Sequence, residues 1–396
     1  MKKWCAIRRC LQIRLSVYIV IALCLLSIVH FFTFYGYYNY THINRDSIDS
    51  KLYKKVHPAV LKRRKQNCTY ESILQRTASM QTWDIGNDTE NFVAAGIDGG
   101  SYVPPQCNPL FSVAVLVTYR NRQKQLDIFL PYMHNFLRKQ NIHYKIYLIE
   151  QQDEKPWNKG LLYNIGARQA IADKFPCLIL QDVDLLPLDE SNLYVCTTEP
   201  RHLSASVDKF RFVLPYDWLV GGVFAIRSDQ YKEVNGFSNR FLGWGGEDDD
   251  FYSRLSMHDM KISRFPRSMS RYTMLAHRPE AKNAARLRIL ADNARRGRAG
   301  AAADGLRAAA PRHLQVRPHR LFTLIAARPP PPLENNPRYA NAERPLRRFM
   351  PAFHYATASF PPIMCEVCVI DEPIEALHLP RLAPLSRFHQ SGAVRG

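Results

Sequence analysis

Residues 112–184 alternate strand-like apolar runs with helix-like segments, and this alternation constrains the possible fold more than any other feature. The strand-like runs cover residues 112–119, 143–150 and 177–184, and residues 159–174 have a helical pattern. Strands and helices that alternate through short connections predict a parallel sheet covered by helices. We therefore expect an α/β domain with ligands bound beyond the carboxyl ends of its strands.

Charged residues follow the first and third of these predicted strands. Arg120 and Arg122 come directly after the first strand, and Asp182 and Asp184 close the third. Alternate residues of an extended strand share a face, so the two carboxylates can meet a divalent cation. Two guanidinium groups suit phosphate oxygens. An isolated Asp-x-Asp pair is common, but its place at a strand end beside two arginines favours a site for the diphosphate of a nucleotide sugar.

The segment 243–250, Gly-Trp-Gly-Gly-Glu-Asp-Asp-Asp, is a second candidate site. Adjacent carboxylates repel one another, so such a run is usually kept on a solvated face or where cations or hydroxyl groups use it. The glycines allow the backbone to approach a ligand closely, and Trp244 offers a flat ring of the kind on which sugars pack. This composition favours a carbohydrate site over the alternative, an acidic turn beside a core tryptophan.

Residues 15–34 form an apolar run without Asp, Glu, Lys or Arg, long enough to cross a bilayer as one helix. By the positive-inside rule, the basic residues before it stay in the cytosol; they are Lys2, Lys3, Arg8, Arg9 and Arg14. We expect a single-pass type II membrane protein with a cytosolic tail (1–14) and a lumenal remainder. The alternative is a cleaved signal peptide, but the run is too long and no Ala-x-Ala-like site follows it.

Residues 35–67 are polar, basic and without clear periodicity, which predicts a flexible stem. Three glycosylation sequons, at Asn39, Asn67 and Asn87, lie on the predicted lumenal side. An even set of cysteines in an oxidising compartment predicts two disulfides, whose pairing the residues alone leave open; the set is Cys68, Cys107, Cys177 and Cys196.

Composition limits the remaining choices. The formal net charge is +19, but the basic residues are spread along the chain without a nucleic-acid motif, which argues against a nucleic-acid partner. Residues 284–396 contain 17 Arg and no Lys, with runs of Ala and Pro. We expect the globular domain to cover residues 68–283. Residues 284–396 are expected to be an atypical tail, either disordered or produced by a change of reading frame.

The order of short motifs between Cys68 and His277 resembles that of the β-1,4-galactosyltransferases, glycosyltransferase family 7, and most of all the invertebrate β-1,4-N-acetylgalactosaminyltransferases. The motifs occupy residues 99–107, 119–122, 157–159, 182–184, 200–202, 208–210, 221–223, 235–237 and 243–250. The resemblance implies a GT-A-type α/β fold in a Golgi membrane protein. It also implies an inverting, manganese-dependent transfer of a sugar from a uridine diphosphate (UDP) donor.

The family's roles carry over to matching residues. The resemblance makes Asp248 the general base that removes the proton of the acceptor hydroxyl, and it places Tyr216, Gly222, Trp244 and Asp249 around the acceptor and the donor sugar. Three further sets are Asp184, Met274 and His277 as manganese ligands; Arg120, Arg122, Trp157, Lys159, Asp182 and Val183 around UDP; and Cys68–Cys107 and Cys177–Cys196 as disulfides. From their spacing, we expect Met274 and His277 on one face of a helical turn.

Leu219 bears on the choice of donor. In galactose-specific members the position two before the first glycine of Gly-Gly-Val holds a tyrosine beside the 2-position of the donor sugar. Leucine leaves room for a 2-acetamido group. We therefore expect transfer of N-acetylgalactosamine (GalNAc) from UDP-GalNAc to the 4-hydroxyl of terminal β-linked N-acetylglucosamine on glycoproteins or glycolipids. The alternatives are transfer of galactose, xylose as the acceptor, or a catalytically weak, truncated or partner-binding member, because the asparagine-proline pattern expected after His277 is missing.

Overall fold

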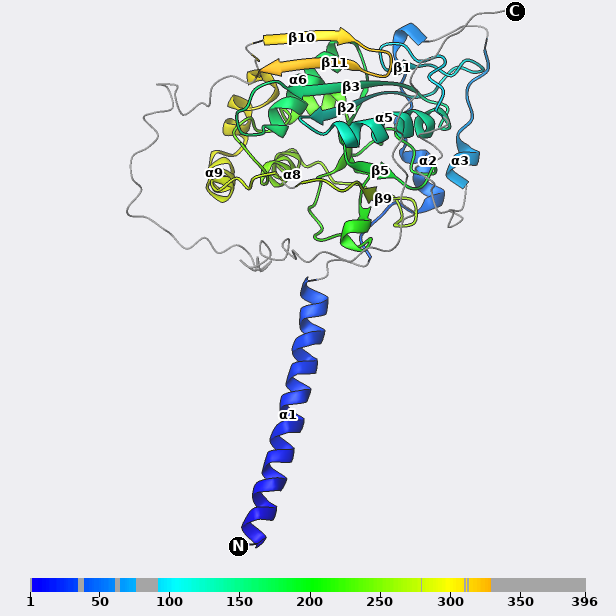
Figure 1. Cartoon of the computed structure of the whole chain (residues 1–396). Helices are drawn as coiled ribbons and strands as arrows, with labels where there is room; N and C mark the ends of the chain where they lie inside the picture. The colour runs from blue at the N-terminus through cyan, green and yellow to red at the C-terminus, as the bar shows by residue number, and fades with distance from the viewer. Residues whose placement is uncertain are drawn as a thin grey trace, which may run out of the picture. The chain divides into compact units, whose positions relative to one another are not determined.

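The structure is a computed structural model that describes residues 2–34, 39–60, 65–75, 92–278, 280–309, 311 and 313–328 (Figure 1). Among these residues, one helix is long and apolar enough to cross a membrane: α1 (Lys2–Phe34), in which Arg14–Phe31 has a mean hydropathy of 2.1. This helix contains the predicted anchor, although a signal sequence would meet the same criteria. Asn39 and Asn67 are exposed, and the third sequon, at Asn87, lies outside the described residues.

The bounds of the other elements are as follows. The helices are α2 (Ile48–Lys51), α3 (Glu71–Gln75), α5 (Gln123–Arg138), α6 (Lys159–Ala172), α7 (Ser228–Glu233), α8 (Glu247–Met257) and α9 (Arg286–Ala303). Short 3-10 helices are η1 (Arg45–Ser47), η2 (Pro58–Val60), η3 (Asp208–Phe210) and η4 (Leu306–Ala308). The strands are β1 (Ser101–Tyr102), β2 (Ser112–Tyr119), β3 (His143–Gln151), β4 (Cys177–Asp182), β5 (Leu185–Pro187), β6 (Arg201–His202), β7 (Ser206–Val207), β8 (Val223–Arg227), β9 (Arg271–Met274), β10 (His313–Pro318) and β11 (Thr323–Arg328).

The main sheet has the strand order β10-β11-β3-β2-β4-β8-β6, and β1 pairs with the first part of β3. Strands β11, β3, β2 and β4 are parallel to one another, whereas β10, β8 and β6 are antiparallel to their neighbours. A smaller sheet has the order β5-β9-β7. The three strands predicted from the sequence are thus the adjacent parallel strands β3, β2 and β4, whose carboxyl ends meet at one edge.

Strand β2 is buried along its whole length because both faces of the sheet are covered. Val113, Val115 and Val117 belong to the core that contains the apolar residues of α5. Ala114 and Leu116 belong to the core that contains those of α6. Successive residues therefore alternate between two apolar environments, which is why this strand is continuously apolar in sequence.

The segment after Asn283 corrects the expectation of an atypical tail. Up to Arg328 it forms α9, β10 and β11, and β11 joins the main sheet beside β3. Ile325 and Ala327 are fully buried. Arginine and alanine are good helix formers, and β11 supplies small and apolar residues to the core, so the change in composition was misleading. Residues 329–396 lie outside the described residues.

Part of the predicted flexible stem packs against the domain, which corrects that prediction for residues 39–60. Ile48 and Leu52 are buried in the core that contains α5. The hydroxyl of Tyr40 donates to the carbonyl oxygen of Phe265 (3.0 Å). The elements of this segment have only three or four residues each, so no helical or strand periodicity marked these contacts in the sequence.

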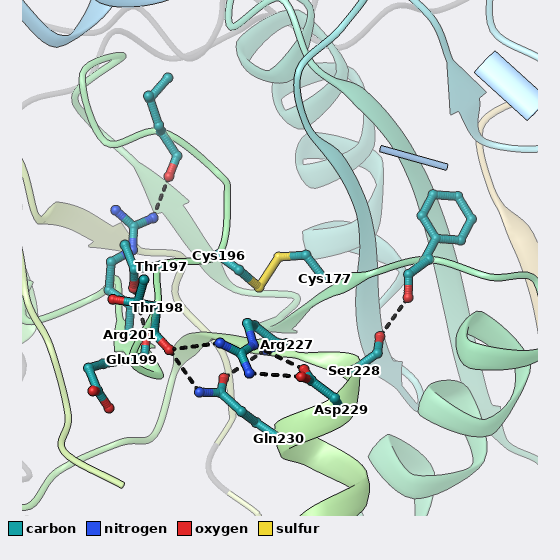
Figure 2. The surroundings of a disulfide bond; sticks show 12 residues. Cys177, Cys196, Thr197, Thr198, Glu199, Arg201, Arg227, Ser228, Asp229 and Gln230 are labelled. Atoms are coloured by element: carbon teal, nitrogen blue, oxygen red, sulfur yellow. Dashed lines mark hydrogen bonds and ion pairs between the residues drawn. A yellow bond between two sulfur atoms is a disulfide. The ribbon is translucent and has the colours of Figure 1, made fainter. Parts of the chain in front are cut away.

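Both expected disulfides are present, Cys68–Cys107 and Cys177–Cys196. The second joins the start of β4 to the segment before β6, as Figure 2 shows. Close to it, the fully buried guanidinium of Arg201 donates to the carbonyl oxygen of Leu193. The cross-link therefore fixes the segment that leads into β6, which pairs with β8.

Candidate functional site

Lys159 joins the two candidate sites. It is the first residue of α6, where the side chain of Asn158 caps the helix by accepting from the backbone N–H of Leu161 (3.0 Å). The Lys159 Nζ atom lies 3.1 Å from Asp182 Oδ1 and 3.6 Å from Asp248 Oδ2. A carboxylate at the end of β4 and one in the first turn of α8 thus share a single ammonium group.

Burial and mutual repulsion perturb the charges around Lys159. Burial, together with the charges of Asp184 and Asp248, raises the pKa of Asp182 to about 6 against the opposing effect of Lys159. Burial and Asp248 likewise raise the pKa of Glu247 to about 7. Burial lowers the pKa of Lys159, but Asp182 and Asp248 outweigh it and raise that pKa well above its usual range. Lys159 therefore stays charged and compensates this acidic cluster.

Each of the four acidic residues in α8 contacts a different partner. They occupy the first turn of the helix, next to its positive end, and Gly246 precedes them with a φ of 95°. Glu247 accepts from the N–H of Gly245 (3.1 Å), Asp248 faces Lys159, Asp249 forms a hydrogen bond with Tyr216, and Asp250 pairs with Arg254 (2.7 Å). The run is therefore neither a solvated face nor a simple acidic turn.

Gly221 and Gly222 allow the backbone to pass close to Asp248 and Asp182. A Cβ atom on Gly221 would collide with the side chain of Asp248. Gly222 has a φ of +90°, and a Cβ atom there would lie 2.6 Å from Ser204 Oγ. The carbonyl oxygen of Gly222 accepts from the N–H of Asp182 (3.1 Å). Side chains are therefore excluded where the chain runs between the strand end and α8.

Asp184 and His277 form a neighbouring group. Strands β5 and β9 pair with Leu185 opposite Met274, and the N–H of Leu275 donates to the carbonyl oxygen of Asp184 (2.7 Å). Met274 therefore ends a strand, which corrects the expected helical turn: strand pairing brings this segment to Asp184. His277 Nδ1 lies 2.8 Å from Asp184 Oδ2, and this hydrogen bond raises the pKa of His277. Carboxylate and imidazole groups ligate divalent cations, so Asp184 and His277 suit such an ion, whereas the thioether of Met274 is an unusual ligand for a hard cation.

Asp182 differs from Asp184 in its partners. Its Oδ1 accepts from the hydroxyl of Tyr163 (3.0 Å), and its Oδ2 accepts from Lys159 (3.2 Å). Tyr163 was not predicted, although it lies four residues after Lys159 on the same face of α6. Val183, between the two aspartates, is 7% exposed and packs in the core.

Arg120 and Trp157 lie together. The Arg120 guanidinium is 5.3 Å from the centroid of the Trp157 ring, and its Nη2 is 3.2 Å from Glu280 Oε1. Arg122 donates to the carbonyl oxygen of Arg278 (2.7 Å). The segment with Arg278 and Glu280 thus contacts both arginines, and no sequence motif indicated Glu280. Arg120 also lines a cavity of about 380 Å³, together with Asn121, Glu150, Gln151, Gln152, Asp153, Glu154 and Arg328.

The predicted acceptor side surrounds the first turn of α8. Burial and Asp248 raise the pKa of Asp249 to about 6, and burial and Asp249 raise that of Tyr216. Trp244 is 44% exposed, and its backbone N–H donates to the carbonyl oxygen of Ala281 (2.8 Å). The structure therefore brings Tyr216, Asp248 and Asp249 together and leaves Trp244 at the surface.

Solved structures with a similar fold come from Drosophila β-1,4-galactosyltransferase 7. One is a mutant in complex with manganese, UDP-Gal and xylobiose, with a TM-score of 0.50 and 24% identity, covering 57% of this chain and 98% of that chain. Another is the catalytic domain with xylobiose, with a TM-score of 0.50 and 23% identity over the same shares. The fold is therefore the GT-A-type α/β fold of these galactosyltransferases.

Sequence comparison identifies the family. Residues 63–197 match the N-terminal region of glycosyl transferase group 7, and residues 201–278 match a model described as the N-terminal domain of galactosyltransferase. β-1,4-Galactosyltransferase 2 of Cricetulus griseus is 43% identical over 187 residues, which are 47% of this chain and 51% of that protein. β-1,4-Galactosyltransferase 1 of Bos taurus is 41% identical over 186 residues, 47% and 46% of the two chains. The chain belongs to glycosyltransferase family 7, the β-1,4-galactosyltransferases, and matches about half the length of these relatives.

Proposed function

We propose that this protein is an inverting glycosyltransferase that moves GalNAc from UDP-GalNAc to the 4-hydroxyl of terminal β-N-acetylglucosamine. The observation that carries the proposal is the Lys159 bridge, in which one ammonium group contacts Asp182 (3.1 Å) and Asp248 (3.6 Å). It joins the strand end suited to a nucleotide diphosphate to the acidic turn suited to an acceptor hydroxyl. Arg120 and Arg122, at the end of β2, supply positive charge for the phosphate oxygens.

In the proposed reaction, Asp248 acts as the general base. Its side chain is 25% exposed, so an acceptor hydroxyl can reach it. Asp248 takes the hydroxyl proton while the acceptor oxygen bonds to the anomeric carbon of the donor. The bond from that carbon to the phosphate oxygen breaks on the opposite face, UDP leaves with the electron pair, and the configuration inverts. Tyr216 and Trp244 are proposed to orient the acceptor sugar.

Manganese is proposed as the cofactor, with Asp184, Met274 and His277 as its ligands. A solved relative contains manganese together with UDP-Gal, and the adjacent Asp184 carboxylate and His277 imidazole suit a divalent cation. When bound, the metal would offset negative charge on the leaving diphosphate. Metal ligation needs a neutral imidazole, and the hydrogen bond with Asp184 raises the pKa of His277, so binding should release the proton of its imidazolium form.

The proposed preference for GalNAc rests on Leu219. Its side chain packs with an apolar cluster of Tyr40, Ala205 and Leu214, and its carbonyl oxygen accepts from Arg264 Nη2 (3.1 Å). An apolar side chain in this setting would favour the methyl group of a 2-acetamido substituent by about 1 kcal/mol. Galactose is the competing donor, because the matched relatives are named galactosyltransferases.

The decisive measurement compares the two donors. Full-length protein with manganese and N-acetylglucosamine is assayed with UDP-GalNAc and UDP-Gal, and the kcat/KM ratio is determined for the parent, Leu219→Tyr and the volume-matched control Leu219→Met. We expect the parent and control to prefer GalNAc and the tyrosine variant to shift toward galactose. A parent that prefers galactose, or a ratio unmoved by tyrosine, removes the donor assignment. Transfer to a β-xyloside in place of N-acetylglucosamine would correct the acceptor.

A catalytically weak or partner-binding member is the alternative function, because the asparagine-proline pattern expected after His277 is missing. Binding of UDP with manganese and no transfer to any acceptor would establish it. For location, we propose a type II protein of the Golgi membrane, anchored by α1. Glycans at Asn39 and Asn67 should then be protected from glycosidase in sealed vesicles.

A further inference from the structure

The segment 39–44, which follows α1 in the sequence, packs against the loop that contains Leu219. Tyr40 of this segment is 6% exposed. It forms an apolar cluster with Ala205 and Leu214, and Leu219 packs against that cluster. The Tyr40 hydroxyl donates to the carbonyl oxygen of Phe265 (3.0 Å), which holds the ring in this position. A residue far from Leu219 in the sequence thus supplies part of its apolar surroundings.

Arg264 makes a second connection between the same two segments. The backbone N–H of Ile43 donates to the carbonyl oxygen of Arg264 (2.9 Å), and the Arg264 guanidinium lies 5.8 Å from the centroid of the Tyr40 ring. This buried guanidinium donates from Nη2 to the carbonyl oxygens of Asp217 (2.6 Å) and Leu219 (3.1 Å). The segment 39–44 is therefore linked to the backbone of Leu219 as well as to its side chain.

We propose that Tyr40 is a positioning residue for donor selection, because its ring limits the positions that the Leu219 side chain can take. This inference rests on the proposed function, in which Leu219 favours the 2-acetamido group of UDP-GalNAc. An apolar side chain selects a methyl group through close contact, and that contact weakens when the side chain can move away. In a closely packed cluster, removal of one ring gives its neighbours room to move.

Ile48 separates this role from a general contribution to stability. It belongs to the same part of the chain as Tyr40 and is fully buried. Its side chain lies in the core that contains α5, whereas Tyr40 lies in the cluster that contacts Leu219. Loss of either side chain should weaken the packing of this part of the chain, but only the loss of Tyr40 removes a neighbour of Leu219.

The test compares the two donors in the full-length protein. Parent, Tyr40→Ala, Tyr40→Phe and Ile48→Ala are assayed with manganese, N-acetylglucosamine and either UDP-GalNAc or UDP-Gal. We expect Tyr40→Ala to lower the kcat/KM ratio of GalNAc to galactose by roughly three- to tenfold, mainly through a higher KM for UDP-GalNAc. Tyr40→Phe keeps the ring and should restore most of the ratio. Ile48→Ala should unfold at lower urea concentration with the ratio of the parent.

A double variant distinguishes this inference from the donor assignment. In Leu219→Ala the supported side chain is absent, so the addition of Tyr40→Ala should leave the donor ratio of Leu219→Ala unchanged. If the parent prefers galactose, the donor assignment fails. The inference then stands only if Tyr40→Ala changes the ratio in the parent and not in Leu219→Ala.

If the parent transfers no sugar, the proposed function fails, and calorimetric binding of UDP-GalNAc and UDP-Gal with manganese gives the ratios for the same variants. Three results would overturn the inference in either assay. They are an unchanged ratio in Tyr40→Ala, an equal change in Ile48→Ala, and the same change when Tyr40→Ala is added to Leu219→Ala.

Discussion

Residues 112–278 and residues 286–328 contribute to the same sheet but supply different things. The first segment carries the charged side chains of the candidate site, including Lys159 and Asp248. The second segment contacts α8, where Asn293 Nδ2 donates to Asp250 Oδ1 (2.6 Å). The proposed reacting groups and some of the contacts that position them therefore come from different parts of the chain.

The largest expected effect is a loss of turnover without a loss of folding, and it concerns the first segment, residues 112–278. In Asp248→Asn the amide cannot accept the proton of the acceptor hydroxyl, so kcat should fall by roughly 10²–10⁴-fold. Binding of UDP-GalNAc, measured by calorimetry with manganese present, should persist. The exposed control Asp217→Asn should keep its turnover with monosaccharide acceptors. Near-normal turnover of Asp248→Asn would remove the general-base assignment.

In α8, Arg254 contacts the second segment through Asp304, and Arg254→Ala should mainly reduce stability. Arg254 is buried, pairs with Asp250 (2.7 Å) and donates to the carbonyl oxygen of Asp304 (2.8 Å), so its loss leaves a buried carboxylate without its cation. We expect the free energy of unfolding in urea to fall by about 3–5 kcal/mol. The matched control is Arg295→Ala, an exposed partner of Asp292, with a cost of at most about 0.5 kcal/mol. Equal costs would show that the buried contacts of Arg254 do not stabilise the fold.

A smaller effect of the same kind is expected within the sheet. Ile325 is fully buried in β11 and pairs with Ile149 of β3, so Ile325→Ala should lower the free energy of unfolding by about 2–5 kcal/mol. Leu314 on β10 is 47% exposed, and Leu314→Ala should cost less than about 0.5 kcal/mol. Similar costs for the two variants would contradict the place of β11 in the sheet.

The first segment was more predictable from the sequence than the second. Strands β2, β3 and β4 were predictable because they are short apolar runs separated by helical segments, and Asp182 followed from its place at a strand end. The contact of Arg254 with Asp304 joins residues 50 positions apart and has no local signal. Composition hid the second segment, because its arginines and alanines resemble a disordered tail, yet the few apolar residues of β11 suffice to fill the sheet.

The smallest expected effect concerns pH. Burial and the charge of Asp248 raise the pKa of Glu247 to about 7, although Lys159 opposes the shift. The folded state therefore holds the Glu247 proton more tightly than the unfolded state does. The stability that this provides is present below about pH 4.5 and is lost as the pH rises through 7. Glu247→Gln cannot titrate, so its free energy of unfolding relative to the parent should increase by about 1–3 kcal/mol between pH 4.5 and 7.5. Urea unfolding of both proteins at several pH values measures this difference. A difference that stays constant with pH would mean that Glu247 is already ionised throughout this range in the folded protein.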